Sequence, residues 1–261
     1  MSDTDTSRPW PGSSREWGDD LRLAAGFLTR LAPPPGDGAT RPLAEAARVF
    51  PLIGLGLGLG AGLVYGLAMV LGLPPALAAV AALAALIATT GALHEDGLAD
   101  SADGLGGGAT RSAKLAIMRD HYIGAYGVIA LTLGLIGRVA ALAALAEPGL
   151  VLAALVTAAA ASRAAIPVVM LLLPRARSDG LGVRAGTPGQ RDVAVGVGLA
   201  LVIAVPAIGF TAALAALIVA ACAALAVASL ARRQIGGYTG DILGAVQQAA
   251  EIAILFTLVA L

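Results

Sequence analysis

Seven long apolar runs, separated by short polar blocks, are the feature that most restricts the fold of this chain. A membrane-spanning helix needs about 20 mostly apolar residues, with a range of roughly 17–25. The runs cover residues 49–73, 76–93, 121–146, 150–173, 192–210, 212–231 and 242–261. A hydrophobic share of 58% and a charged share of 13% are typical of a membrane protein. We therefore predict an all-α, polytopic helix bundle with about seven transmembrane helices.

The cationic residues fall on one side of this predicted topology. All Lys and Arg residues except Arg138 and Arg163 lie in the N-terminal segment or in the blocks 94–120, 174–191 and 232–241. Since cationic loops mark the cytoplasm, we expect a multi-pass protein of the cytoplasmic (inner) membrane with its N-terminus inside. Residues 192–231 could form a hairpin or one bent helix. The hairpin is favoured, because it keeps Arg232 and Arg233 inside.

The N-terminal region differs from the rest of the chain. Residues 1–18 are polar, and we expect them to form a disordered leader before a single transmembrane domain at residues 19–261. Residues 19–31 have an amphipathic pattern but are too short to span. We expect an interfacial helix there, ended by the Pro- and Gly-rich residues 33–38.

An acidic block follows the second apolar run. His94 and Glu95 open it, and Asp96, Asp100 and Asp103 follow at i, i+4 and i+7. If the apolar helix continues into this block, the three Asp residues share about 60° of arc on one face. Like charges on one face repel and favour a bound cation, and carboxylates suit Mg²⁺, which also binds phosphates. A solvated acidic helix end is the alternative.

Cationic and basic groups near this block are candidates for catalysis and phosphate binding. Arg111, Lys114 and Arg119 follow the carboxylates and could hold phosphate oxygens, or could only anchor the chain at the membrane surface. His94 and Asp120, or a carboxylate free of metal, could act as the general base.

A second polar block, residues 232–241, ends where the last span begins. Gly236, Gly237 and Gly240 precede Asp241, so the backbone could approach a ligand closely there. An Asp at this position could instead only cap the helix. Two ionisable residues, Arg163 and Glu251, lie ten residues inside their spans, where an unpaired charge is costly. We predict that these two pair or share a polar cavity under the active site.

Several of these segments together resemble a known family. Residues 94–104, 117–120 and 123–127, then 236–241 and 243–245, and the N-terminal segments 27–30 and 50–54 are similar to the cobalamin synthases, adenosylcobinamide-GDP ribazoletransferases. The similarity covers nearly the whole chain after about residue 20. It implies transfer of the cobinamide-phosphate moiety of adenosylcobinamide-GDP to a ribose hydroxyl of α-ribazole or its 5′-phosphate. GMP would leave, Mg²⁺ would be required, and the reaction is a late nucleotide-loop assembly step of cobalamin biosynthesis.

We combine this resemblance with the residue patterns to predict the site. The expected metal ligands are Glu95, Asp96, Asp100, Asp103 and Asp241, and the expected catalytic groups are Asp96, Asp100, Asp103, His94 and Asp120. The expected substrate-binding residues are Arg111, Lys114, Arg119, Arg163, Gly237, Thr239 and Gly240. Expected partners are the two substrates and membrane lipid, with no nucleic acid at a formal net charge of +0. The sequence leaves open whether the protein is a monomer or a homo-oligomer.

Two other functions remain open from the sequence. A CDP-alcohol phosphotransferase of lipid synthesis would carry an Asp-Gly-x-x-Ala pattern. Here Ala99 follows Asp96-Gly97 after one residue instead of two, and Asp100 comes next, so the match to that family is only partial. A small-molecule transporter would place ionisable residues such as Arg138 and Arg163 within spans. The polar blocks lie on one side, however, and no internal repeat is visible.

Overall fold

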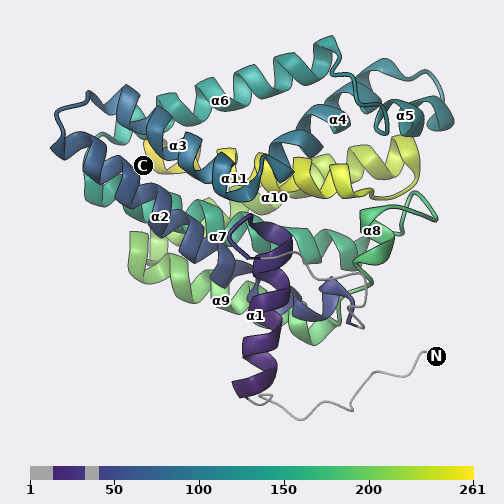
Figure 1. Cartoon of the computed structure of the whole chain (residues 1–261), viewed down its shortest axis with the longest axis horizontal. Helices are drawn as coiled ribbons and strands as arrows, with labels where there is room; N and C mark the ends of the chain where they lie inside the picture. The colour runs from purple at the N-terminus through teal and green to yellow at the C-terminus, as the bar shows by residue number, and fades with distance from the viewer. Residues whose placement is uncertain (1–13, 33–40) are drawn as a thin grey trace.

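The computed structural model describes residues 14–32 and 41–261, and these form an all-α bundle without a β-strand (Figure 1). One isolated bridge joins Arg175 and Tyr238. The elements are α1 (Ser14–Leu28), the 3-10 helix η1 (Leu43–Val49), α2 (Phe50–Val70), α3 (Pro75–Thr90), α4 (Leu93–Gly107), α5 (Arg111–Ile117), α6 (Ala125–Leu145), α7 (Pro148–Leu172), α8 (Leu181–Arg184), α9 (Gln190–Ile208), α10 (Phe210–Ile235) and α11 (Gly240–Ala260).

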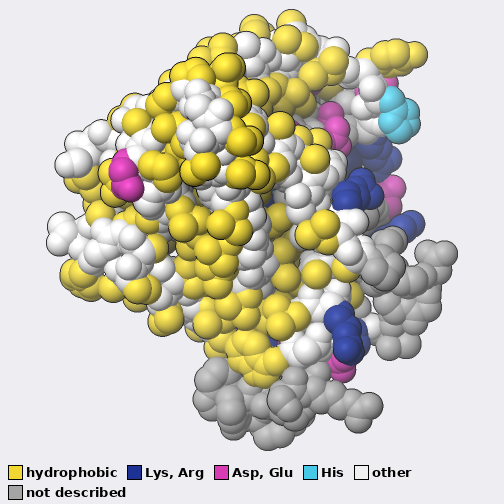
Figure 2. Space-filling view, turned by 60° about the vertical axis from the view of Figure 1, so that its left-hand side comes forward, with side chains coloured by type: hydrophobic (Ala, Val, Ile, Leu, Met, Phe, Trp, Pro, Cys, Tyr) yellow, Lys and Arg dark blue, Asp and Glu magenta, His cyan; other side chains and the backbone are white. Residues whose placement is uncertain are grey.

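The helices that could cross a membrane agree with the predicted number. In the described part of the chain, six helices are long and apolar enough, and α3 with α4 makes a seventh if this bent pair is one span. The surface agrees as well, because apolar side chains cover most of the face in Figure 2 and most of the visible charged side chains gather along one edge. The protein is therefore a multi-pass membrane protein.

The second predicted span differs from the expected straight helix. It breaks after α3, and α4 leaves at an angle of 89°. Gly91 and Ala92 both have positive φ, at 65° and 57°. The Gly91 amide donates to the Ala88 carbonyl (3.2 Å) and the Ala92 amide to that of Ile87 (3.0 Å), so the end of α3 is capped. Because of this break, the acidic residues lie on a separate helix.

Helix α7 is the central element of the bundle. It packs against α2, α9 and α11 and is buried over most of its length. Its contact with α2 depends on glycine: a Cβ on Gly58 would lie 2.6 Å from the Leu155 carbonyl oxygen, and one on Gly54 would clash with the backbone of Ala159. Small residues allow such close backbone approach in membranes. The glycine-rich start of α2 is thus a packing face.

Residues 192–231 form two helices, as favoured from the sequence. Helices α9 and α10 are separated at Gly209, which adopts a φ of 82°. A glycine adopts this backbone conformation without the steric strain that a side chain would bring.

Helix α1 begins earlier than predicted, at Ser14, so the expected leader is too long by the helical residues 14–18. The remaining leader and the Pro- and Gly-rich segment lie outside the described residues. Asp20 fixes α1 to η1: it is fully buried and accepts bonds from Arg41 (2.8 Å) and Arg48 (2.7 Å). The Arg48 guanidinium also lies 4.4 Å from the ring centre of Trp17. The amphipathic helix is thus held against the bundle by buried charges.

Candidate active site

The acidic face of α4 meets the first turn of α11. A Cβ on Gly97 would lie 2.8 Å from the Asp241 carbonyl oxygen, so only glycine allows this approach. The crossing brings Asp96 and Asp100 of α4 near Asp241, and the negative charges of Asp96 and Asp241 both act on Asp100. The structure therefore brings the acidic block of α4 to Asp241, although more than 130 residues separate Asp103 from Asp241 in the sequence.

Asp103 has a different environment from the other acidic residues. It is 7% exposed, and its two carboxylate oxygens accept the backbone N–H groups of Gly124 (2.7 Å) and Gly127 (2.9 Å). A carboxylate at this position satisfies free amides at the start of α6 and interacts favourably with the helix dipole. Asp103 thus fastens α6 to α4, a role that the spacing of the acidic residues did not predict.

Two pockets adjoin the acidic cluster, and Asp96 lines both. The first, the inner pocket, has a volume of about 280 Å³ and lies between α1, η1, the start of α2, α4, α7, α8 and α11. Its walls are largely apolar and include Phe27, Phe50, Ile166 and Met170. The second, the outer pocket, has a volume of about 470 Å³ and is lined by polar groups that include Asp100, Arg119, Asp120, His121 and Tyr122.

Charged residues of the segment between α7 and α8 line the inner pocket together with Asp241. Arg177 Nη1 lies 3.7 Å from Asp241 Oδ2, while its Nη2 donates to the Leu115 carbonyl (2.8 Å). Burial lowers the pKa of Arg177, and the charge of Asp241 opposes that shift. Arg119 forms an ion pair with Asp179 of the same segment. Arg177 and Asp179 were not predicted as site residues.

The last polar block contributes to the inner pocket through Thr239 and Gly240. Thr239 caps α11: its Oγ1 accepts the Ile242 amide (3.3 Å) and donates to Asp241 Oδ2 (3.1 Å), which orients that carboxylate. Gly237, in contrast, has a packing role, because a Cβ there would clash with the Pro174 carbonyl oxygen. The close approach allows the Tyr238 amide to donate to that oxygen (2.9 Å).

Two predicted phosphate ligands lie away from both pockets. Arg111 donates to the carbonyls of Ile235 (2.7 Å) and Ala176 (2.8 Å), and Lys114 donates to that of Leu105 (2.6 Å). Their cationic groups satisfy free carbonyls near the ends of α10 and α4. The structure does not bring either residue to the acidic cluster.

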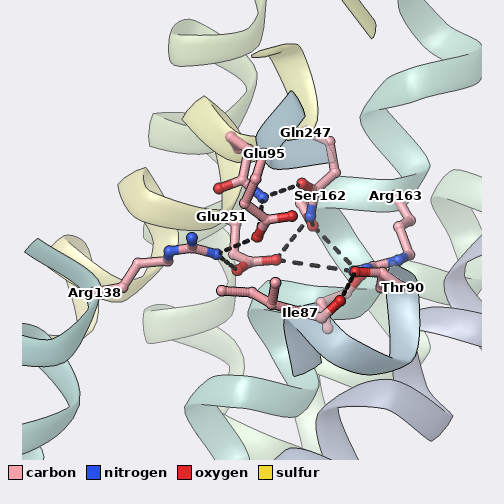
Figure 3. Close-up of polar contacts among 10 residues, drawn as sticks. Ile87, Thr90, Glu95, Arg138, Ser162, Arg163, Gln247 and Glu251 are labelled. Carbon is pink, nitrogen blue, oxygen red and sulfur yellow. Dashed lines mark hydrogen bonds and ion pairs between the residues drawn. The ribbon is translucent and has the colours of Figure 1, made fainter. Parts of the chain in front are cut away.

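A network of buried charges lies among α4, α6, α7 and α11 (Figure 3). Arg138 Nη1 is 3.1 Å from an oxygen of Glu95 and 3.1 Å from one of Glu251. Arg163 Nη1 lies 3.8 Å from the other oxygen of Glu251, which also accepts from Gln247 (2.7 Å). The predicted pairing of Arg163 with Glu251 is confirmed, and Arg138 is the member that was missed.

This network changes the interpretation of two predicted site residues. Arg163 is 1% exposed and lines neither pocket, so the structure does not place it for substrate binding. Glu95 lines the outer pocket, but its Oε1 accepts from Arg138 and from Gln248 (3.2 Å). The structure thus ties Glu95, a predicted metal ligand, to the charge network.

The two side chains that were named as candidate general bases, His94 and Asp120, line different pockets. His94 lines the inner pocket, is 3% exposed, and has an Nε2 atom without a hydrogen-bond partner in the part of the chain that the structure describes. Asp120 lines the outer pocket and is exposed.

The acidic cluster offers an incomplete set of metal ligands. Within residues 14–32 and 41–261, no group of three or more His, Cys, Asp or Glu side chains is arranged to hold a metal ion by itself. Mg²⁺ is usually held by one or two carboxylates together with water and substrate phosphates. Asp96, Asp100 and Asp241 offer hard oxygens of like charge near one another, so this donor set fits an ion whose coordination a phosphate ligand completes.

The fold and this site define a polytopic membrane protein with two adjoining pockets beside a cluster of acidic residues. Comparison of the sequence with protein families gives a more specific result. The chain belongs to the cobalamin-5-phosphate synthase family, whose model matches residues 20–259.

Two relatives of this chain are both named adenosylcobinamide-GDP ribazoletransferase. An adenosylcobinamide-GDP ribazoletransferase of Bradyrhizobium diazoefficiens is 51% identical over 240 residues, which cover 90% of this chain and 91% of the relative. One of Mesorhizobium japonicum is 46% identical over 245 residues, or 93% of each chain. No solved structure matches. The family match therefore supports a cobalamin synthase over a CDP-alcohol phosphotransferase or a transporter.

Proposed function

We propose that this protein transfers the cobinamide-phosphate moiety of adenosylcobinamide-GDP to a ribose hydroxyl of α-ribazole or its 5′-phosphate. Family membership and the names of the relatives support this activity. The structural observation that carries it is Asp96, which lines both pockets. A transferase must bring a donor and an acceptor together, and the two pockets meet at an acidic cluster suited to a pyrophosphate-bound cation.

The reaction is a phosphoryl-group displacement. The ribose oxygen attacks the phosphorus attached to cobinamide and forms a new P–O bond. The bond from that phosphorus to the bridging oxygen breaks, and GMP leaves with this oxygen and its electron pair. The hydroxyl proton passes to a base. Such reactions depend on positioning and on neutralising charge, which buried carboxylates and guanidinium groups can arrange.

In this proposal two of the three carboxylates Asp96, Asp100 and Asp241 would hold Mg²⁺ together with phosphate oxygens of the donor, with Asp103 near them on α4. When bound, Mg²⁺ neutralises negative charge on the pyrophosphate and on the departing GMP. Arg119 and Arg177 lie beside the cluster and would bind the remaining phosphate oxygens, because guanidinium groups bind phosphate in a bidentate manner. Arg119 must exchange its ion pair with Asp179 for the phosphate.

Three groups remain candidates for the base: a carboxylate of the cluster that metal does not occupy, Asp120 and His94. Asp96 is favoured as the carboxylate that stays free of metal, since it alone of these candidates lines both pockets. A base must come within hydrogen-bond reach of the attacking hydroxyl, and the junction of the pockets is where that hydroxyl would lie.

We also infer that the site opens to the cytoplasm and that the protein lies in the inner membrane. The distribution of Lys and Arg supports this orientation. The polar edge in Figure 2 would then face the cytoplasm, where soluble substrates reach it.

The direct test is release of GMP by the purified protein in lipid vesicles supplied with adenosylcobinamide-GDP, α-ribazole and Mg²⁺. We expect GMP and the joined cobalamin product in equal amounts. Vesicles without α-ribazole are the control. Transfer from CDP-diacylglycerol to an alcohol, with no GMP formed in the first assay, would overturn the proposal in favour of a lipid-synthesis enzyme.

A further inference from the structure

The inner pocket is small and largely apolar away from its charged mouth. Phe27, Phe50, Ile166 and Met170 supply apolar walls from three helices. Its volume of about 280 Å³ is near the lower end of the range for small-molecule sites, which begins at about 300 Å³. A macrocycle with a nucleotide attached cannot enter such a space, whereas one flat bicyclic ring can.

His94 is one of the polar side chains that line this pocket. His94 is 3% exposed, yet its Nε2 has no hydrogen-bond partner among the residues that the structure describes. Buried polar atoms are almost always paired, because an unpaired one loses its hydrogen bonds to water without replacement. A pocket-lining histidine with a free ring nitrogen is therefore suited to a ligand that carries one matching polar atom on an otherwise apolar surface.

The chemistry of the acceptor meets these requirements. A benzimidazole riboside is joined to ribose through one ring nitrogen, and its other ring nitrogen has a free lone pair that only accepts hydrogen bonds. The rest of the ring is flat and apolar. A neutral imidazole can carry its proton on Nε2 and donate it to such an acceptor.

We propose that the inner pocket binds the benzimidazole ring of the acceptor and that His94 donates a hydrogen bond from Nε2 to its free ring nitrogen. This assignment rests on the proposed function and specifies which substrate occupies which pocket. The adenosylcobinamide-GDP donor then occupies the larger outer pocket and the surface around it. His94 is an acceptor-binding residue in this arrangement, which removes it from the candidates for the general base.

The same arrangement brings the ribose to the reacting groups. With the ring among Phe27, Phe50 and Met170, the ribose lies at the charged mouth, near Asp96 and Asp241. A guanine ring fits the pocket less well, because its polar edge carries several donors and acceptors and would meet mainly apolar side chains. Each unpaired polar group there would be penalised.

The test compares two acceptors that differ in one ring atom. Indole riboside has a C–H group where benzimidazole riboside has its free nitrogen, and the reacting ribose is unchanged. We expect wild-type protein to use benzimidazole riboside with a kcat/KM at least about tenfold higher, as for loss of one buried hydrogen bond. In His94→Leu the ratio should fall to about twofold or less, and His94→Gln, which retains an N–H donor, should keep part of it.

A second readout measures binding without turnover. The fluorescence of the benzimidazole ring reports binding of the riboside when no donor is present. Phe27→Ala should weaken this binding while leaving the KM for the donor within about twofold, since it removes only apolar contact area. Phe210→Ala is the matched control, because Phe210 is 66% exposed and lines neither pocket.

The outcomes separate this inference from the proposed function. If wild-type protein releases no GMP with any riboside, the proposed function fails, and the assignment of the pocket fails with it. If wild-type protein is active but does not distinguish the two ribosides, or if His94→Leu distinguishes them as strongly as wild type, only the assignment is overturned. If His94→Leu does not fold, the Phe27→Ala variant decides: riboside binding as strong as in the wild type would overturn the assignment of the pocket.

Discussion

Gly97 of α4 and Gly244 of α11 face each other so closely that a Cβ on Gly97 would lie 3.1 Å from the Cα of Gly244. We expect Gly97→Ala to separate the two helices, because the added carbon also meets backbone at Asp241. Overpacking of this kind costs about 1–3 kcal/mol and should reduce GMP release together with thermal stability. Gly56→Ala on α2, with nothing within 4 Å, is the control and should leave both unchanged or raise stability. Equal stability and activity of the two variants would contradict this role.

The buried charge network should make a large contribution to the stability of the fold. Arg138→Met removes the cation between two carboxylates and should lower the free energy of unfolding by about 3–5 kcal/mol, since an unpaired buried charge remains. Adding Glu95→Gln should recover part of this loss, because Glu251 keeps Arg163 as its partner. The measurement is a double-mutant cycle on unfolding in detergent. Strictly additive losses would show that the two residues do not interact.

Asp100 and Asp103 lie three residues apart on one helix but should respond differently to the same substitution. Asp100→Asn should fold normally and lose about a hundredfold or more in turnover, each 1.36 kcal/mol being tenfold. It should also require a higher Mg²⁺ concentration, and a chelator should abolish wild-type turnover until Mg²⁺ is restored. Asp103→Asn should lower thermal stability, because an amide cannot accept both backbone bonds at the start of α6. Normal Mg²⁺-dependent turnover by Asp100→Asn would refute its role at the metal.

Arg175 offers a test of the preferred acceptor form. It is exposed at the inner pocket and donates to the Thr187 hydroxyl (2.8 Å). A guanidinium group there can bind a phosphate on the ribose. We expect Arg175→Ala to raise the KM for α-ribazole 5′-phosphate by about tenfold and to change that for α-ribazole little. Arg233→Ala, at the end of α10 and lining neither pocket, is the matched control. An equal rise for both acceptors would argue against a phosphate contact.

The predicted orientation can be measured by cysteine labelling in intact cells. The chain has one native cysteine, Cys222, which is exposed and must first be replaced by serine. An impermeant thiol reagent should then label Leu261→Cys but not Arg233→Cys, since the cationic block belongs inside. Labelling of Arg233→Cys from outside the cell would show that the predicted orientation is wrong.

Much of the helical arrangement could be predicted because apolar runs and their polar boundaries determine where spans begin and end. The break at Gly91 and Ala92 was not predicted, because the apolar run continues to Leu93 and a residue other than glycine, such as Ala92, rarely adopts a positive φ. The pairing of Arg163 with Glu251 was predictable, because each charge lies in a span and requires a partner. The position of Arg177 could not be predicted, because it depends on the bridge that joins Arg175 of the same loop to Tyr238.

The buried charge network can be fully paired only late in synthesis of the chain. Glu95, Arg138 and Arg163 reside on α4, α6 and α7, and Glu251 follows only on α11, near the end of the chain. Until α11 enters the bilayer, the earlier helices hold two cations and one anion. Among the described residues of this network, α11 supplies the second carboxylate, so a chain that ends before α11 would leave one arginine without a carboxylate partner inside the bilayer, where an unpaired charge is costly.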